Sequence, residues 1–482
     1  MEKKLLIGFS EKSITPDRPI SLAGQFHTRI SEYVETPVMV NVMAVETADN
    51  CMILCSCDLV SVSSALVRKV RSRITERCAD IDTDKIIISA THTHTSLAYG
   101  APEDSTRPAA TSCANANTVM PNCKRFVNNT VIGEEVLHGA AATEFLAYRI
   151  SDAIVEAWGA RQPALCSLGF GRASIGYCRR VIRGRGVHKL GYEIKEENVF
   201  KEVEGGSDTG IEMIFVNDSE SKPIGVVASV ACPSQIVENK YFVSSDYWGK
   251  ARNYLKEHFG EDFHIIGLCS AAGDQSPRDT LRFLRGIEPS MTDIEGTVSV
   301  GKDLSCAVIN AYERVKGGFV PEIDLIHKTV MLDMPINKLT EEEYNEAKAR
   351  LYAYVEEADK DVFDFKDMVR IHPEVGKVFL YEWQKNFDTL PAEIHVVRFG
   401  DMAIATNPFE LFLDYGNQIK ARSKAKQTML IQLAMDRMGY LPTRKAEPNG
   451  GYGTSIVSCY CGHEGGEFLV EKTLEIINSM WD

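Results

Sequence analysis

The first half of the chain alternates apolar, strand-like runs with amphipathic, helix-like segments, and this alternation restricts the fold more than any other feature. Residues 38–48, 51–60 and 84–96 each contain a continuous apolar run of strand length. Residues 64–78 and 144–162 instead space their apolar side chains three and four apart, which is the period of a helix. We therefore predict an α/β protein with a large mixed β-sheet core and flanking helices.

The same rhythm continues to the end of the chain with one interruption. Strand-like runs recur at 211–218, 223–235, 262–279, 392–413 and 428–436. Residues 337–388 are helical in pattern and highly charged, and Thr340 with Glu343 matches a capping box. We predict a helical insertion on the surface there. No linker or low-complexity tract divides the sequence, so we predict one large domain over residues 1–482.

Composition sets limits on partners and compartment. The chain has 53 basic and 67 acidic side chains, a net charge of −14, which argues against a nucleic-acid partner. The sequence has no transmembrane span, and the apolar run near its start is too short for a signal peptide. The 13 cysteines lie mostly in apolar runs, as expected for reduced thiols. We predict a cytoplasmic protein with a small-molecule substrate; homo-oligomer formation is left open.

Two histidines end one of the strand-like runs. His92 and His94 follow the run 86–90 in "IIISATHTHTSLAYG", in a chain with only 11 histidines. In an extended segment residues i and i+2 point to the same face, so the two imidazoles would lie side by side. Open α/β sheets place ligands at this end of their strands. A polar strand end with two half-exposed histidines is the alternative.

The polar segment from Tyr99 to Gly133 follows this pair directly. It is rich in small residues and has no period of its own. Loops of this length inside a compact protein are usually functional or disordered. We predict that it covers the substrate.

Five short stretches join a strand to a polar or glycine-rich loop, and together they resemble the neutral/alkaline ceramidase family. The resemblance runs in order along nearly the whole chain, and "THTHTS" and "GDQSP" are its specific parts. The stretches are "THTHTS" (91–96), "ACPSQ" (231–235) with "SSDYWG" (244–249), "AAGDQSP" (271–277), "NPFELF" (407–412) and "GYLPT…GGYG" (439–453).

This resemblance implies a zinc hydrolase that holds one zinc ion per chain and cleaves an amide or ester bond. The implied metal ligands are His92, Cys232, Glu410 and Tyr452. The implied catalytic residues are Ser276 beside the metal, His94 as proton carrier, Asp274, and Arg179 or Arg180 as a substrate contact. We expect this chain to lack the further β-sandwich domain that most exported family members carry. We also expect a small polar substrate, with sugar-derived compounds among the candidates.

The chain departs from the family pattern at two positions. Cys232 stands where the family has its second histidine ligand, and Gly453 stands where a glutamate follows the last tyrosine. Zinc accepts thiolate as it accepts imidazole, so Cys232 remains a candidate ligand. It is also a candidate nucleophile of a metal-thiolate glycoside hydrolase, or a buried core cysteine. The departures keep open a non-catalytic relative that has lost its metal.

Three further carboxylates have individual predictions. Glu410 follows an apolar run, and a partly buried carboxylate needs a partner such as a metal. Asp58 ends a strand-like run, where it is expected to support a metal-site histidine. Asp246 is expected to be a helix N-cap.

Overall fold

The structure is a computed structural model that describes residues 5–100, 119, 125–126, 132–183, 187–190, 200–287, 291–358, 360 and 362–482. Its largest element is an eight-stranded mixed sheet, which confirms the predicted fold class. In spatial order the strands are β17 (His264–Cys269), β15 (Pro223–Val230), β14 (Gly210–Asp218), β9 (Gln162–Arg172), β1 (Leu6–Ser13), β5 (Met39–Glu46), β6 (Cys51–Cys57) and β7 (Ile86–Ala90).

This sheet folds over at the junction between β9 and β1. The two strands are antiparallel and pair only through Gln162 and Pro163 with Ile7 and Leu6, near the start of each strand. They therefore lead away from the junction, and the two halves of the sheet turn to face each other. Contacts of β17 with β1, β5, β6 and β7 show the result. The parallel pairs β6–β7 and β15–β17 end at the same side of the molecule, where Ser234 Oγ donates to the Thr91 carbonyl at 2.8 Å.

Helices cover the outer faces of both halves. α3 (Gly139–Gly159) packs on β1, β5 and β6, and α1 (Ser64–Arg77) packs beside it. α6 (Ile294–Val315) packs on β9, and α4 (Asp246–Phe259) lies between α6 and β17. Each helix buries an apolar stripe at helical spacing; in α3 it includes Leu146, Ile150 and Ile154.

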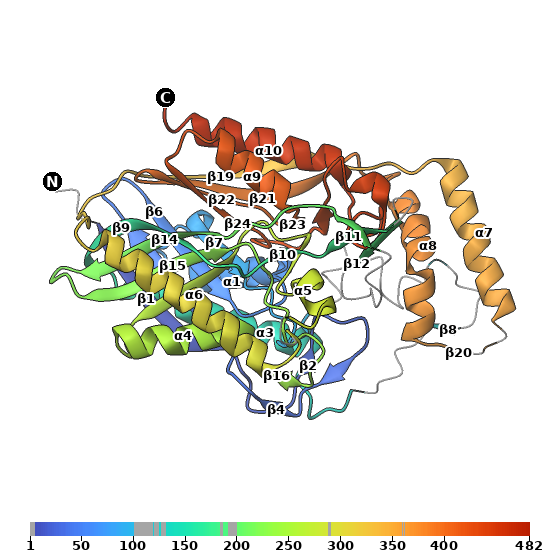
Figure 1. Ribbon diagram of the computed structural model, residues 1–482, viewed down its shortest axis with the longest axis horizontal. Coiled ribbons are helices and arrows are strands. Elements are labelled where there is room, and N and C mark those ends of the chain that lie inside the picture. The colour runs from blue at the N-terminus through green and yellow to red at the C-terminus, as the bar shows by residue number, and fades with distance from the viewer. Residues whose placement is uncertain are drawn as a thin grey trace.

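A second, four-stranded sheet lies along the first. It consists of β19 (Leu325–Pro335), β21 (Thr389–Phe399), β22 (Met402–Thr406) and β24 (Gln427–Ile431). β24 contacts β14, β15 and β17, and β19 contacts β6. α9 (Leu413–Arg422) and α10 (Gly462–Asn478) cover its outer face, as the top of Figure 1 shows. β22 and β24 are parallel, and Gln432 after β24 donates its backbone N–H to Cys269 at the end of β17.

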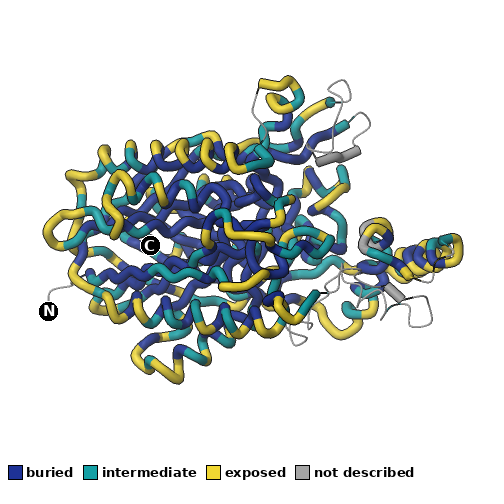
Figure 2. The backbone as a smooth tube through the Cα atoms, turned by 90° about the horizontal axis from the view of Figure 1, so that it is seen from below, coloured by how far each residue is buried: buried dark blue, intermediate teal, exposed yellow. Residues whose placement is uncertain are grey.

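The charged segment predicted as an insertion forms two helices at one end of the molecule (Figure 1). They are α7 (Glu341–Glu357) and α8 (Phe365–Trp383), and the predicted capping box of Thr340 and Glu343 is present. α7 is mostly exposed and projects from the buried body in Figure 2. A small core that includes Leu351 and Val375 joins the two helices.

Short elements complete the loops. They are α5 (Thr280–Leu284), the 3-10 turns η1 (Thr83–Lys85) and η6 (Glu447–Asn449), and the strand groups β2 (Ser21–Leu22) with β3 (Arg29–Ile30), β4 (Tyr33–Val34) with β16 (Phe242–Val243), β10 (Tyr177–Cys178) with β18 (Gln275–Ser276), β8 (Arg125–Phe126) with β20 (Val362–Phe363), β23 (Glu410–Leu411) with β25 (Tyr440–Leu441), and β11 (Arg180–Arg183) with β12 (Val187–Leu190) and β13 (Phe200–Val203). The β23–β25 pair sets Glu410 opposite Tyr440. Within the described residues, every helix is too short or too polar to cross a lipid bilayer.

Candidate active site

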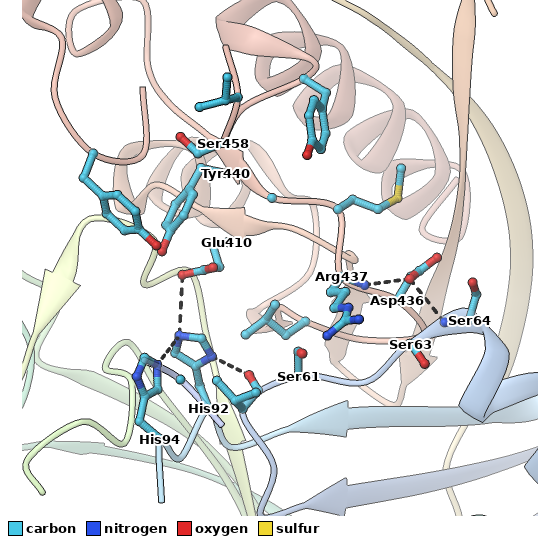
Figure 3. Close-up of a pocket in the computed structure, with 18 of the residues that line it drawn as sticks. Ser61, Ser63, Ser64, His92, His94, Glu410, Asp436, Arg437, Tyr440 and Ser458 are labelled. Carbon is cyan, nitrogen blue, oxygen red and sulfur yellow. Dashed lines mark hydrogen bonds and ion pairs between the residues drawn. The ribbon is translucent and has the colours of Figure 1, made fainter. Parts of the chain in front are cut away.

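A cavity of about 520 Å³ opens where the strands of both sheets end. His92, His94, Glu410, Tyr440 and Tyr452 line one part of it. Figure 3 shows the His92 and His94 imidazoles below the Glu410 carboxylate and the Tyr440 ring above it. His92 and His94 come from the loop after β7, Glu410 from β23, Tyr440 from β25 and Tyr452 from the loop before α10, so the fold gathers residues from distant parts of the chain.

His92 is held by the neighbouring strand end. β7 stops at Ala90, and His92 has a left-handed backbone with φ of 64°. The two histidines therefore do not come together through the alternation of an extended strand, as the sequence predicted. A non-glycine residue in this conformation costs about 1–3 kcal/mol and is frequent at functional sites. The His92 Nδ1 lies 2.5 Å from the Val60 carbonyl, to which it donates, so that in the neutral form of this imidazole the lone pair lies on Nε2.

Three donor atoms converge beside His92. Its Nε2 lies 3.4 Å from His94 Nε2 and 3.5 Å from Glu410 Oε2. The rings of the two histidines meet edge to face, with centroids 4.8 Å apart. Both imidazoles and the carboxylate thus face one small volume.

His94 has two neighbours that the sequence did not single out. The Gln235 amide nitrogen lies 2.7 Å from His94 Nε2, and Glu238 Oε2 lies 3.7 Å from its Nδ1. Burial, and then the nearby His92 and arginine charges, hold the pKa of His94 well below its usual value. His94 is therefore neutral at physiological pH. Gln235 was quoted in "ACPSQ", but a glutamine there carries no signal of its own.

Glu410 is fully surrounded by groups that favour its charged form. Burial alone would raise its pKa, but His92, Arg179 and the Tyr440 hydroxyl hold the pKa below its usual value. Burial and the Glu410 charge raise the pKa of Tyr440 well above its usual value, so this phenol keeps its proton. Tyr440 was not among the predicted residues, although it lies in the quoted "GYLPT" stretch. Tyr452 packs edge-on against it at 5.4 Å.

The structure separates the roles of the two adjacent arginines. Arg179 is buried, and its Nη2 donates to the Gly273 carbonyl at 2.9 Å and to the Tyr440 hydroxyl at 3.3 Å. Arg180 forms a buried ion pair with Glu204 and donates to the Tyr452 carbonyl at 2.9 Å. Arg179 therefore borders the reacting groups, whereas Arg180 fastens the tyrosine loop.

Comparison with known proteins finds similarity in structure but not in sequence. No protein-family model matches the sequence, and no curated protein matches it. Solved structures do match, two ceramidases among them. Neutral ceramidase from Pseudomonas aeruginosa has a TM-score of 0.70 at 14% identity, covering 100% of this chain and 75% of its own. A ceramidase complexed with C2 has a TM-score of 0.68 at 14% identity, covering 99% and 75%. The chain has the neutral ceramidase fold.

Three residues implied by the ceramidase resemblance do not line the cavity. Ser276 is buried, and its Oγ accepts from the Arg278 backbone N–H at 3.3 Å. Asp274 Oδ1 accepts from the Leu413 N–H at 2.9 Å, at the start of α9. Cys232 Sγ lies 3.4 Å and 3.6 Å from two carbonyl oxygens, those of Pro233 and Ile175.

These positions bear on the roles predicted for the three side chains. Burial raises the pKa of the Cys232 thiol well above its usual value, and its neighbours are mostly apolar. Its role as zinc ligand or nucleophile stays a prediction that this placement does not favour. The catalytic roles of Ser276 and Asp274 stay predictions too; in this structure both side chains stabilise the segment between β17 and α5, and Asp274 ties it to the start of α9.

The two predicted supporting aspartates also have defined contacts. Asp58 forms a buried ion pair with Arg252 at 2.6 Å and accepts from the Thr91 hydroxyl at 3.1 Å, so it fixes the residue before His92. Asp246 is the first residue of α4, and Ser245 is the N-cap, which corrects the prediction. The Asp246 carboxylate accepts from the Val237 N–H at 3.0 Å and so supports the loop that carries Gln235. Most of the predicted covering segment lies outside the described residues.

The donor set fits a zinc ion in its chemistry. Within the part of the chain that the structure describes, no group of three or more His, Cys, Asp or Glu side chains is placed so that it could hold a metal ion. However, ligands that each bind a tetrahedral zinc at about 2.0–2.1 Å lie about 3.4 Å from one another, and the His92–His94 and His92–Glu410 separations are 3.4 and 3.5 Å. Metal-binding histidines also donate their second N–H to a carbonyl or carboxylate. The Val60 carbonyl provides this acceptor for His92, whereas Glu238 Oε2 lies 3.7 Å from His94 Nδ1, beyond hydrogen-bond distance.

Proposed function

We propose that this protein is a zinc-dependent hydrolase that cleaves an amide bond in a small polar substrate. The observation that carries the proposal is the convergence of His92 Nε2, His94 Nε2 and Glu410 Oε2 on one volume of an open cavity. Two histidines and one glutamate form the ligand set of many zinc hydrolases. The ceramidase fold supports the reaction class.

The zinc site that we propose consists of His92, His94 and Glu410. Bound zinc supplies a Lewis acid and a water of lowered pKa. In this assignment His94 is a ligand, where the sequence predicted a proton carrier. The phenol of Tyr452 either takes the metal-ligand position predicted for it or contacts the substrate. Cys232 is left out because its sulfur faces carbonyl oxygens.

Tyr440 and Arg179 have the chemistry to assist the reaction. The raised pKa of Tyr440 keeps its hydroxyl protonated, so it can donate a hydrogen bond to an oxygen that gains negative charge. Arg179 donates to that hydroxyl and fixes its position. The guanidinium also adds positive charge near Glu410. An ester with the same acyl group would meet the same groups.

The proposal is tested with a panel of small amides and esters, scored by release of amine or alcohol from the purified protein. We expect hydrolysis by the wild type, and its loss in His92→Ala and Glu410→Gln. His258→Ala, an exposed histidine on α4, is the matched control. Release of a reducing sugar from glycosides, with amides untouched, would contradict the proposal. Hydrolysis that survives in both site variants would also contradict it.

A further inference from the structure

The cavity extends well beyond the histidines, and two arginines line its other part. They are Arg68 on α1 and Arg437 in the loop after β24. Ser61 and Ser64 line the same part. Among the described residues, neither guanidinium has an ion pair or a hydrogen bond to a side chain or carbonyl. Figure 3 shows Arg437 near Ser61 on the opposite side of His92 from His94.

Both arginines are anchored at the same turn of α1. Asp436 Oδ1 accepts from the backbone N–H of Ser64 at 3.2 Å and of Arg437 at 2.8 Å, so the Arg437 backbone is fixed at the start of the helix. Arg68 follows Ser64 by four residues and therefore lies above it on the same helix face. Two separate segments thus bring their positive charges to one part of the cavity wall.

The N-terminus of α1 does not itself provide the binding site for a ligand. The hydroxyl of Ser63 accepts from the Leu66 N–H at 3.2 Å, and Asp436 accepts from Ser64, so these two N–H groups of the first turn are already bonded. The carboxylate of Asp436 is buried and engaged with the backbone. The groups in this part of the cavity that remain available to a ligand are the two guanidiniums and the nearby hydroxyls.

Both arginines are exposed at the cavity wall, and neither has an acidic partner among the described residues. The chain carries a net charge of −14, so acidic partners are plentiful. Some other exposed arginines have such partners: Arg422 pairs with Glu471 and Arg444 with Glu467. A guanidinium presents a planar set of donors that matches the oxygens of a carboxylate or phosphate.

We propose that Arg68 and Arg437 bind an oxyanion on the substrate while its amide bond lies at His92 and Glu410. This inference rests on the proposed function, because it places both groups in one cavity. The substrate class is then an amide that carries a carboxylate or phosphate, such as an acylated amino acid or the amide of a dicarboxylic acid.

Binding is tested first, without any reaction. Calorimetry measures the affinity for glutarate and for inorganic phosphate in the wild type, in the double variant Arg68→Gln/Arg437→Gln, and in His92→Ala. Arg444→Gln is the matched control, and thermal melting verifies that each variant is folded. We expect a loss of about tenfold for each arginine removed, with weaker binding as salt rises. His92→Ala and Arg444→Gln should keep the site. Phosphate binding more tightly than glutarate would identify phosphate as the preferred group.

Turnover is tested with pairs of amides that share the scissile bond and differ only in a terminal carboxylate or carboxamide. One pair carries this group on the acyl side and one on the amine side. We expect the charged member of one pair to have a kcat/KM about tenfold higher or more, and the double variant to abolish this preference while it still cleaves the neutral member.

The two proposals fail in different ways. Equal kcat/KM for both members of each pair, with glutarate and phosphate binding unchanged in the double variant, would overturn the oxyanion site and leave the hydrolase standing. Arginine-dependent binding of glutarate by a protein that cleaves none of the amides would support the oxyanion site and contradict the hydrolase.

Discussion

The molecule contains two pairs of contacting histidines, and their surroundings differ. His92 and His94 lie beside an open cavity with both Nε2 atoms 3.4 Å apart and facing the same volume. His327 on β19 and His395 on β21 lie between the sheets, where Nε2 of one and Nδ1 of the other are 2.8 Å apart, a hydrogen bond. Contact between two imidazoles therefore does not by itself indicate chemistry.

The buried pair, His327 and His395, belongs to a hydrogen-bond network made up of protein groups. His395 Nε2 lies 3.0 Å from Glu393 Oε1, and Arg71 binds both oxygens of Glu393. The other nitrogen of His327 lies 3.2 Å from the Cys51 carbonyl. Every ring nitrogen here has a protein partner, so this pair stabilises the contact of the second sheet with β6 and α1. At the cavity, by contrast, the Nε2 atom of His92 faces space that a ligand can enter, while that of His94 accepts from the Gln235 amide beside it.

The largest expected difference between the pairs is in activity. His92→Ala and Glu410→Gln should each lower kcat/KM by roughly 10³-fold or more, because both remove a proposed metal ligand. His327→Gln should change kcat/KM less than about threefold, since it lies outside the cavity. Steady-state kinetics on the best amide of the panel measure all three. A similar loss in all three variants would mean that the two pairs are not distinct.

The opposite order is expected for stability. His395→Ala should lower the free energy of unfolding by about 2–4 kcal/mol, because it leaves His327 and one side of Glu393 without their partner inside the protein. His258→Ala on the surface should change it by less than about 0.5 kcal/mol. Urea denaturation compares the two variants. A His395→Ala protein as stable as the wild type would contradict the structural role assigned to the buried pair.

The buried pair should also make the protein acid-sensitive. Burial lowers the pKa of His327 to about 3, and it lowers the pKa of His395 as well. In the unfolded chain both protonate near pH 6.5, so the unfolded state binds more protons below that pH and stability falls as pH falls from 6.5 towards 3. Between about pH 7.5 and pH 5, His327 contributes a loss of about 2 kcal/mol, and His395 adds a loss of the same sign.

Denaturation at these two pH values compares the wild type with His327→Gln. The free energy of unfolding of the variant should fall less on acidification, because the contribution of His327 to the loss is absent. An equal loss in both proteins would contradict the neutral, buried state of His327.

The smallest effect concerns the backbone at His92. Its φ of 64° is unfavourable for any side chain, so His92→Gly should be more stable than His92→Ala by about 1 kcal/mol. Both variants lack the imidazole, so their difference reports the backbone alone. Thermal unfolding of the two side by side measures it. No difference would argue that the loop relaxes when the imidazole is lost.

The sequence predicted what local patterns determine. Apolar runs at strand length and helical spacing were enough for the mixed sheet, the flanking helices and the capping box at Thr340. "THTHTS" and "NPFE" pointed to His92, His94 and Glu410 because each follows a buried strand directly. The family resemblance added Tyr452 and Arg179, which line or border the cavity.

Other features depend on contacts that no local pattern encodes. His327 and His395 lie 68 residues apart and meet only through the antiparallel register of β19 and β21. Gln235 and Glu238 reach His94 because Asp246 holds the Val237 backbone. The place of Cys232 is decided by the direction of one side chain, which spacing alone does not fix. Arg68 and Arg437 come together through the carboxylate of Asp436, across more than 360 residues of sequence.

Metal content tests the central claim most directly. Elemental analysis is made on wild-type protein purified without added metal, on His92→Ala, and on His327→Gln as the histidine-matched control. We predict about one zinc per chain in the wild type and in His327→Gln, and less than about a tenth of that in His92→Ala. Equal zinc in wild type and His92→Ala, or a wild type that takes up none when zinc is supplied, would contradict the account.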